Sequence, residues 1–336
     1  MLDRRKGAIL RAIVRDYVRS GQPVGSQTLG RRYRLKISPA TIRNEMAQLE
    51  EQGFLTHPHT SAGRIPTDRG YRWFVDNWPG GTWPALPDRQ RIRIERLTSF
   101  DFRGLEEALE GTSRVLSEVT EATAVVVAPP VRKNLLRRLE LIPRDDGRVT
   151  LLLIADTGVV EQGLVDLPET TPEQLHALAA DLSIELEGVA FEDLSGRVRG
   201  AGKVPARSRI ATEVERITGT TPERVFREGT ANILTPEKFP DIAVAHEVVE
   251  ALESPSTIAG LADAARRTEH VTVFIGGEVP VRQMRSCAVV ISSYEAGTGR
   301  VGTLGVVGPT RIDYPHTISA VQAISRSLSE ILDLTV

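Results

Sequence analysis

The stretch SPATIRNEMAQLEEQGFLTHPHTSAGRIPT, residues 38–67, predicts a helix followed by a short hairpin. Ser38 is a preferred N-cap residue, and Pro39 suits the first helical position. Gly53 is a natural C-terminal stop, so the helix is expected to end near Glu51. The apolar positions repeat at helical spacing and predict a stripe that faces a core: Ile42, Met46 and Leu49.

The opposite side of this helix carries side chains suited to reading DNA. Arginine, asparagine and glutamine make bidentate contacts to base edges in the major groove. The candidates for base contact are Thr41, Arg43, Asn44 and Gln48. The hairpin would follow as a wing that lies on the DNA backbone or minor groove. The alternative for a polar helix face taken alone is that it is only solvated.

The residues before this helix favour the DNA-binding interpretation. An apolar stripe at helical spacing predicts a first helix over residues 4–20, which Gly21 ends. Ser26 then caps a short second helix that ends near Tyr33. Three helices and a hairpin within seventy residues are typical of a winged helix-turn-helix domain.

The charge of the chain is divided unevenly. Residues 1–78 hold 14 lysines and arginines against 7 acids, a formal charge of +7, while the whole chain carries −2. A basic first module on an acidic remainder fits nucleic-acid binding by that module. A basic cluster, which includes Arg34 and Lys36, directly precedes the recognition helix. The candidates for backbone contact are Arg31, Arg32, Ser38, His59, Thr60, Ser61 and Arg64.

Composition excludes several classes of protein. The chain has 336 residues, 40% of them hydrophobic and 26% charged, which is ordinary for a soluble globular protein of two or three domains. It contains neither an eighteen-residue apolar run nor an N-terminal signal region, so a cytoplasmic protein without membrane contact is expected. The single cysteine, Cys287, is expected to be a buried core residue in a reducing compartment.

The remaining 258 residues predict an α+β body. The run Pro79–Pro87 is rich in glycine and proline and predicts a linker on which the first domain could swivel. Short strands with tight turns are expected between residues 122 and 165 and again between residues 271 and 307. Because a mostly helical region separates them, one α+β domain over 88–170 and 241–336 with an insertion at 171–240 is the simplest topology. Within the insertion, Gly196 and Gly200 predict a loop.

Two stretches resemble catalytic or ligand sites. Gly297–Gly302 matches the pattern G-x-G-x-x-G, but strands are expected on both sides, so a hairpin turn is favoured over a dinucleotide site. The cluster Thr310, Arg311 and Asp313 has two interpretations, structural pairing at the end of the last strand or a ligand surface. The sequence contains no convincing catalytic constellation, metal site or cofactor motif, so an enzyme is not expected.

Several strings together resemble the HrcA family of heat-inducible transcription repressors. They are PVGSQTL, SPATIRNEMAQLEEQGFL and HPHTSAGRIPTDRGYR near the N-terminus, and EGTANIL, FIGGE, SSYE and GVVGPTRIDY later. Family members often have Met where Ile312 stands and Glu where Gly277 stands. The resemblance implies a winged helix over 1–78, a GAF-like domain over 88–170 and 241–336, and an inserted dimerisation domain over 171–240.

The resemblance also implies a function. The family represses chaperone operons by binding, as a homodimer, an inverted-repeat operator called CIRCE in double-stranded DNA. The chaperonin GroEL promotes the active form. Two alternatives remain at this point: a metabolite-responsive repressor with a small effector in the GAF-like domain, and an enzyme that the N-terminal module only localises.

Overall fold

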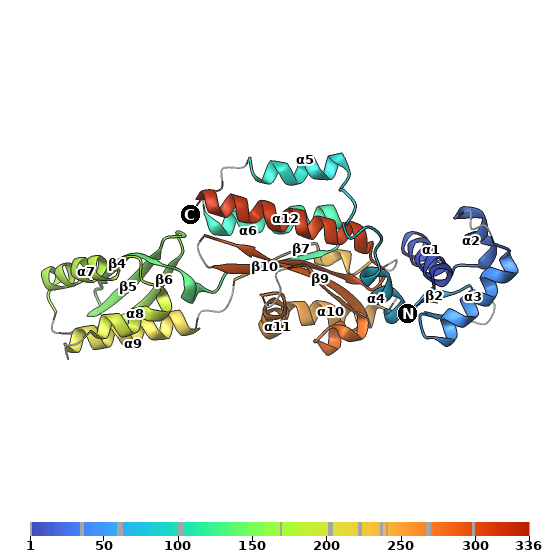
Figure 1. Cartoon of the computed structure of the whole chain (residues 1–336). Helices are drawn as coiled ribbons and strands as arrows, with labels where there is room; N and C mark the ends of the chain where they lie inside the picture. The colour runs from blue at the N-terminus through green and yellow to red at the C-terminus, as the bar shows by residue number, and fades with distance from the viewer. Residues whose placement is uncertain are drawn as a thin grey trace.

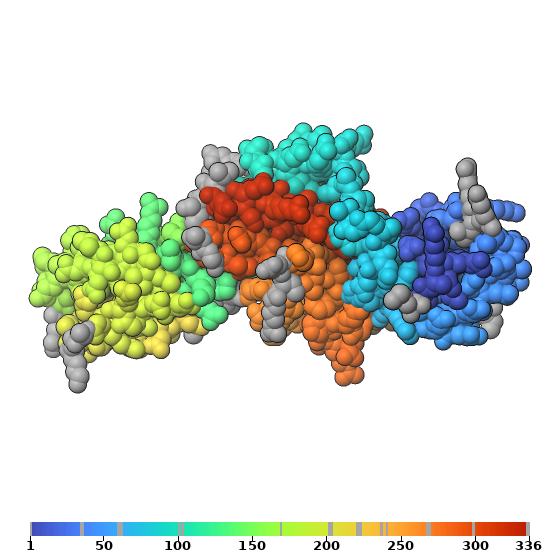
Figure 2. Space-filling model, in the orientation of Figure 1, coloured from blue at the N-terminus to red at the C-terminus, as the bar shows by residue number. Residues whose placement is uncertain are grey.

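The computed structural model shows three parts in a row, which we call the head, the body and the insert (Figure 1). The structure describes residues 2–33, 37–58, 63–99, 102, 104–168, 170–200, 204–220, 224–235, 238–239, 241–266, 270–297 and 300–335. Figure 2 shows the three parts as successive lobes of an elongated molecule, with the head at one end and the insert at the other. The chain is α+β, as the sequence predicts.

The head is built from residues 2–76. Its elements are α1 (Arg4–Ser20), α2 (Ser26–Arg32), α3 (Pro39–Glu51), β1 (Leu55–Thr56), β2 (Ile65–Pro66) and α4 (Asp68–Asp76). The predicted stripe of α3 is buried, with exposed fractions of 5% or less at its three positions. Asp3 caps α1 and Gly21 ends it in the left-handed conformation that glycine tolerates best.

The body is centred on a five-stranded antiparallel sheet in the order β7-β3-β10-β9-β8. Its elements are α5 (Asp88–Leu97), α6 (Leu105–Thr120), β3 (Thr123–Val127), β7 (Val225–Glu228), α10 (Ile242–Glu253), α11 (Pro255–Arg266), β8 (Thr272–Ile275), β9 (Cys287–Glu295), β10 (Val301–Pro309) and α12 (Tyr314–Thr335). Four single 3-10 turns also occur: Val131–Lys133, Thr230–Asn232, Gly276–Glu278 and Arg282–Met284. The turn between β9 and β10 coincides with the G-x-G-x-x-G string, so the hairpin interpretation is confirmed at its described ends.

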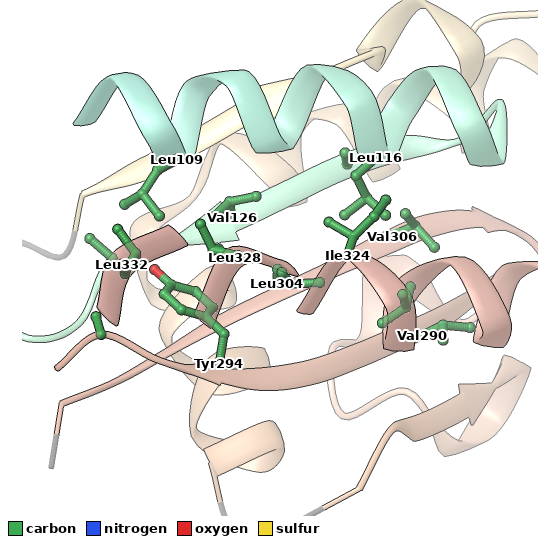
Figure 3. Close-up of a cluster of buried hydrophobic side chains, with 14 of the residues drawn as sticks. Leu109, Leu116, Val126, Val290, Tyr294, Leu304, Val306, Ile324, Leu328 and Leu332 are labelled. Atoms are coloured by element: carbon green, nitrogen blue, oxygen red, sulfur yellow. The ribbon is translucent and has the colours of Figure 1, made fainter. Parts of the chain in front are cut away.

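Helices cover both faces of this sheet (Figure 1). One face packs against α6 and α12, and Figure 3 shows Val126, Leu304 and Val306 of the strands meeting Leu116 and Ile324 of those helices. The other face packs against α10 and α11. Cys287 lies there without solvent exposure, and burial raises the pKa of its thiol to about 12. It is therefore a core residue, as predicted.

The insert has its own three-stranded sheet in the order β4-β5-β6, with helices on one face. Its elements are β4 (Leu136–Pro143), β5 (Arg148–Ala155), β6 (Val160–Asp166), α7 (Pro172–Leu186), α8 (Phe191–Arg199) and α9 (Pro205–Thr220). These three strands precede residue 171, where the insertion was expected to begin. They nevertheless pair with one another and pack on α7–α9, and they do not join the sheet of the body. The loop expected around Gly196 is also replaced by α8, because Phe191, Leu194 and Val198 form a buried helical stripe.

A buried ion pair joins the insert to the body. Arg300 follows the β9–β10 turn, is 4% exposed, and donates to both carboxylate oxygens of Asp156 at 2.8 and 2.9 Å. Asp156 also accepts from the backbone N–H groups of Leu135 and Thr157. The two residues are 144 positions apart, so no local pattern could have paired them.

We expect Arg300→Gln to lower the free energy of unfolding by roughly 3 kcal/mol, because it leaves a partly buried carboxylate without its cation. Equilibrium unfolding in urea, followed by circular dichroism, measures the change. Arg148→Gln is the matched control, since Arg148 pairs with Asp146 at an exposed turn of the same insert and should cost less than ~1 kcal/mol. Equal urea midpoints for the two variants would contradict the structural role of Arg300.

Candidate nucleic-acid interface

Helix α3 presents its predicted contact side chains outward. Arg43, Asn44 and Gln48 are exposed, while Thr41 is half-buried. Ser38 caps the helix, because its hydroxyl accepts the N–H of Thr41 at 3.1 Å. These residues therefore lie together on the solvent side of one helix, opposite its buried stripe.

Basic partners neutralise two of the three acids of α3, and the third, Glu51, is exposed at the C-terminal end of the helix. Glu45 is 12% exposed and lies 3.6 Å from both Arg5 and Lys6 of α1. Glu50 lies 2.7 Å from Nε of Arg64 and also contacts His57. The Arg64 contact lacks hydrogen-bond geometry, so it is an ion pair only. Neutralised acids repel phosphate less than free ones.

The pKa of Glu50 reflects this environment. Burial raises the pKa of the Glu50 carboxyl group. The hydrogen bond from His57 and the charge of Arg64 together lower this pKa by more than burial raises it, so the net shift is downward. A carboxyl group with a lowered pKa stabilises the fold above its unfolded pKa of roughly 4.3 and loses that contribution as the pH falls through the folded value. The base of the hairpin is therefore most stable with Glu50 ionised.

The hairpin is tied to the turn before α2. Val24 and Arg64 exchange two backbone hydrogen bonds of 2.9 and 3.0 Å, which extends the β1–β2 pair by one bridge. A Cβ atom at Gly63 would lie 2.4 Å from the Val24 carbonyl, so only glycine fits there. His59, Thr60 and Ser61, predicted to contact the backbone, lie outside the described residues.

The two arginines at the end of α2 have different surroundings. Arg32 pairs with Asp16 of α1, which is 3% exposed and also accepts from Arg19 at 3.0 Å. Arg31 is exposed, and no carboxylate of the described residues lies within 4 Å of it. Arg31 can therefore reach a phosphate freely, whereas Arg32 also holds α1 and α2 together. Arg34 and Lys36 lie outside the described residues.

The head is docked on the body by polar contacts that the sequence did not reveal. Arg72 of α4 pairs with Glu278 at 2.9 Å and also donates to the carbonyl of Val273. Asp68 accepts the N–H of Gly277 at 3.1 Å. Burial raises the pKa of Glu278, but Arg72 lowers it more, so this ion pair weakens as the pH falls through the lowered value.

The linker also packs on its surroundings. Trp78 stacks on Trp83 with ring centroids 5.4 Å apart and donates to the carbonyl of Thr82. Ser319 of α12 donates to the carbonyl of Pro84 at 2.8 Å. The freely swivelling head expected from Pro79–Pro87 is therefore not the arrangement in the structure, because aromatic stacking and these hydrogen bonds hold the linker.

The residues of the cluster near residue 310 contact the head and the start of α12. Arg311 donates to the carbonyl of Val18 at the C-terminal end of α1, where a cation also suits the helix dipole. Asp313 caps α12 through the N–H of His316 at 3.2 Å. The hydroxyl of Tyr314 donates to the carbonyl of Thr310. The ring of Tyr314 packs against the ring of Tyr71 of the head, with the two ring centroids 5.5 Å apart. The cluster therefore joins the last strand to the head.

Neither a metal site nor a membrane span is supported by the described part of the chain. It contains no group of three or more His, Cys, Asp or Glu residues that could hold a metal ion. Within the same ranges, every helix is too short or too polar to cross a bilayer.

Comparisons with known proteins agree with this geometry. The chain is 37% identical to the heat-inducible transcription repressor HrcA of Symbiobacterium thermophilum, over 98% of this chain and 99% of that protein. It is 40% identical to the HrcA repressor of Acidothermus cellulolyticus, over 99% of both. A crystal structure described as a hypothetical protein matches with a TM-score of 0.68 and 25% identity, covering all of both chains.

These matches show that the chain is similar to transcription repressors over nearly its whole length. The family model described as the HrcA protein C terminal domain matches residues 106–318. The chain belongs to the HrcA family, as the sequence motifs indicated.

We expect Arg72→Gln to loosen the docked head, because it removes the cation that Glu278 and Val273 share. Amide hydrogen exchange of the body segment 273–279 should accelerate roughly three- to tenfold, since Gly277 donates to the head. The control is Arg69→Gln on the same helix, whose arginine contacts only Phe54 and Gln52 within the head. Equal exchange in both variants would show that Arg72 does not hold the head.

Proposed function

We propose that this protein is a negative transcriptional regulator of heat-shock chaperone operons, with no enzymatic activity of its own. It would bind an inverted-repeat operator of the CIRCE type and block transcription by occupying promoter DNA. The observation that carries the proposal is the outward face of α3, where Arg43, Asn44 and Gln48 are exposed opposite the buried stripe. The names of the relatives support the same function.

In this proposal the head is a winged helix-turn-helix. The N-terminal half of α3 enters the major groove, and the β1–β2 hairpin lies against the backbone or minor groove. Base contacts come from Thr41, Arg43, Asn44 and Gln48. Backbone contacts come from Arg31, Arg32, Ser38, His59, Thr60, Ser61 and Arg64.

The body would be a GAF-like domain and the insert a dimerisation domain. On the sheet topology we propose limits for the insert of about 131–220, because β4–β6 pack on α7–α9 while β7 pairs with β3. A dimer is needed because an inverted repeat mirrors the two-fold symmetry of its reader.

The outer face of the insert sheet supports this role. Its cross-strand neighbours put five apolar side chains on the face that α7–α9 leave open: Ile142, Leu152, Ile154, Val160 and Leu164. Three of these side chains are 42–50% exposed. Exposed apolar side chains that gather on one face of a surface sheet are typical of a protein interface, and a second copy of this chain would cover them.

Regulation is proposed from the family resemblance alone. The chaperonin GroEL would promote the DNA-binding form, and its titration by unfolded protein would release repression. A metabolite-responsive repressor is the alternative, and one observation favours it: a cavity where the head meets the body, described in the next subsection.

The deciding experiment is a titration of a labelled CIRCE-type duplex with the full-length protein at two salt concentrations, with and without GroEL. The proposal expects tight binding that falls with salt, exceeds binding to a scrambled duplex, and improves with GroEL. Weak binding that is equal for both duplexes would overturn the operator assignment. Selective binding that ignores GroEL would overturn only the chaperonin part.

We expect Asn44→Ala to reduce discrimination between operator and scrambled DNA by ~1–3 kcal/mol, because a bidentate base contact is lost. Competition titrations with single-base operator variants measure the loss. Gln52→Ala is the control, since Gln52 is exposed at the opposite end of the same helix, away from the groove. Unchanged discrimination by Asn44→Ala would remove this residue from the contact set.

Arginine substitutions at the end of α2 test phosphate binding. Arg31→Ala should weaken binding to all DNA and lower the slope of log K against log salt by about 1, the value for one lost phosphate contact. Arg32→Ala should give the same change in slope and also lower the stability of the head, because Asp16 keeps only Arg19 as a partner. An unaltered slope would exclude the substituted arginine as a phosphate contact.

Substitutions on the insert sheet test the dimer. Leu164→Lys should raise the dimer dissociation constant at least ~tenfold, because it places a charge in a contact that the partner would desolvate. Sedimentation velocity at several concentrations gives the oligomeric state. Ile242→Lys is the control, since Ile242 is 78% exposed on α10 of the body. A variant at Leu164 that dimerises like the original chain would exclude this face.

A further inference from the structure

A cavity with a volume of about 850 Å³ lies where the head meets the body. The head supplies part of its wall through α1, Tyr33 and α4. The body supplies most of the rest through the ends of α6, β10 and α12 together with Asn232, Ile233 and Lys238. Small-molecule sites usually have volumes of 300–1,000 Å³ and often lie between domains, so this cavity has the size and place of a ligand site.

The wall of the cavity combines rings and aliphatic side chains with polar groups. Both parts and the linker offer apolar contact surface: Val14, Val18 and Phe74 of the head, Trp78 of the linker, and Ile233 and Ile312 of the body. Polar groups stand among them, including Gln90 and His316, which contact one another at 2.7 Å. A ligand that fits this wall has an apolar or aromatic part and a polar part.

Positive charge exceeds negative charge on the described wall. The cations are Arg15, Arg19, Lys238 and Arg311, and the acids are Glu121 and Asp313. Asp16 outside the cavity neutralises Arg19, so three cations still face two acids. The polar part of a fitting ligand is therefore an anion.

Lys238 is the best-placed anchor on the body side. Its ammonium group is half-buried and donates to the backbone carbonyl of Glu121. No carboxylate of the described residues lies within 4 Å of it, although the Glu121 charge acts from farther away. Burial lowers the pKa of Lys238 despite that charge. A desolvated ammonium with two remaining donors gains most from an anionic partner.

Arg15 is the counterpart on the head side. Its guanidinium lies over the ring of Trp78, 5.2 Å from the centroid, and no carboxylate of the described residues lies within 4 Å of it. Stacking leaves the N–H edge of a guanidinium available for hydrogen bonds. The two walls thus each present one cation without a carboxylate partner.

We propose that this cavity binds a small organic anion, a carboxylate or phosphate carried on an apolar or aromatic body, between Arg15 of the head and Lys238 of the body. The ligand would contact both parts at once. Its binding free energy would therefore stabilise the docked arrangement that Arg72, Asp68 and Arg311 already hold. This inference does not depend on the identity of the operator.

The test uses 8-anilinonaphthalene-1-sulfonate, a fluorescent aromatic anion, titrated into the full-length protein. We expect one saturable site per chain, and an increase in the melting temperature of the protein with probe concentration. Lys238→Gln and Arg15→Gln should each weaken binding about tenfold, the effect of one lost charge-assisted hydrogen bond. Lys133→Gln and Arg132→Gln, which remove the same charges from an exposed turn elsewhere, should leave binding unchanged.

Other results would overturn the inference. Binding that is unchanged in either cavity variant would show that the anion does not lie between the two cations. Binding that disappears in Leu164→Lys would place the probe on the apolar face of the insert instead. Circular dichroism of each variant checks that the fold is intact, and the matched controls separate a local effect from a change in net charge.

Discussion

The central constraint on this molecule is that the five-stranded sheet is apolar on both faces. Val126, Leu304 and Val306 point to α6 and α12, while Val125, Val127 and Val289 point to α10 and α11. Such a sheet is stable only when helices cover both sides. The helices that supply this cover come from segments before and after the insert in the sequence, so the body forms from both segments as one unit.

The head depends on how its acids are placed. A recognition helix with free carboxylates would repel DNA, yet α3 contains Glu45, Glu50 and Glu51. The fold directs Glu45 to α1 and Glu50 to the hairpin, where basic side chains lie within 4 Å. The same ion pairs that hold α1, α3 and the hairpin together thus neutralise two of the three acids of α3, while Glu51 is exposed at the C-terminal end of the helix. In the proposed DNA-binding role, these pairs would stabilise the head and also reduce its repulsion of phosphate.

Much of the fold could be predicted from local patterns. The period of 3.6 in α1, α3 and α12 and the short apolar runs of β3, β9 and β10 gave the correct kinds of element, because these segments are long or strongly patterned. Two errors have physical reasons. Helix α8 was missed because its glycine, Gly196, favours a loop, and the separate sheet of β4–β6 was not foreseen because apolar alternation does not say which sheet a strand joins.

The sequence by itself determined the elements, the polar composition of the α3 face, the basic charge of the head and the family. These are local properties, carried by spacing, capping residues and motifs such as PHTSAGRIPT. Only the tertiary structure decided which side chains are neutralised, how the head is docked, and that Arg300 joins the body to Asp156 of the insert. The reason is distance along the chain: Arg5 lies 40 positions from Glu45, Asp156 lies 144 from Arg300, and Arg72 lies 206 from Glu278, so only packing of the whole chain brings such partners together.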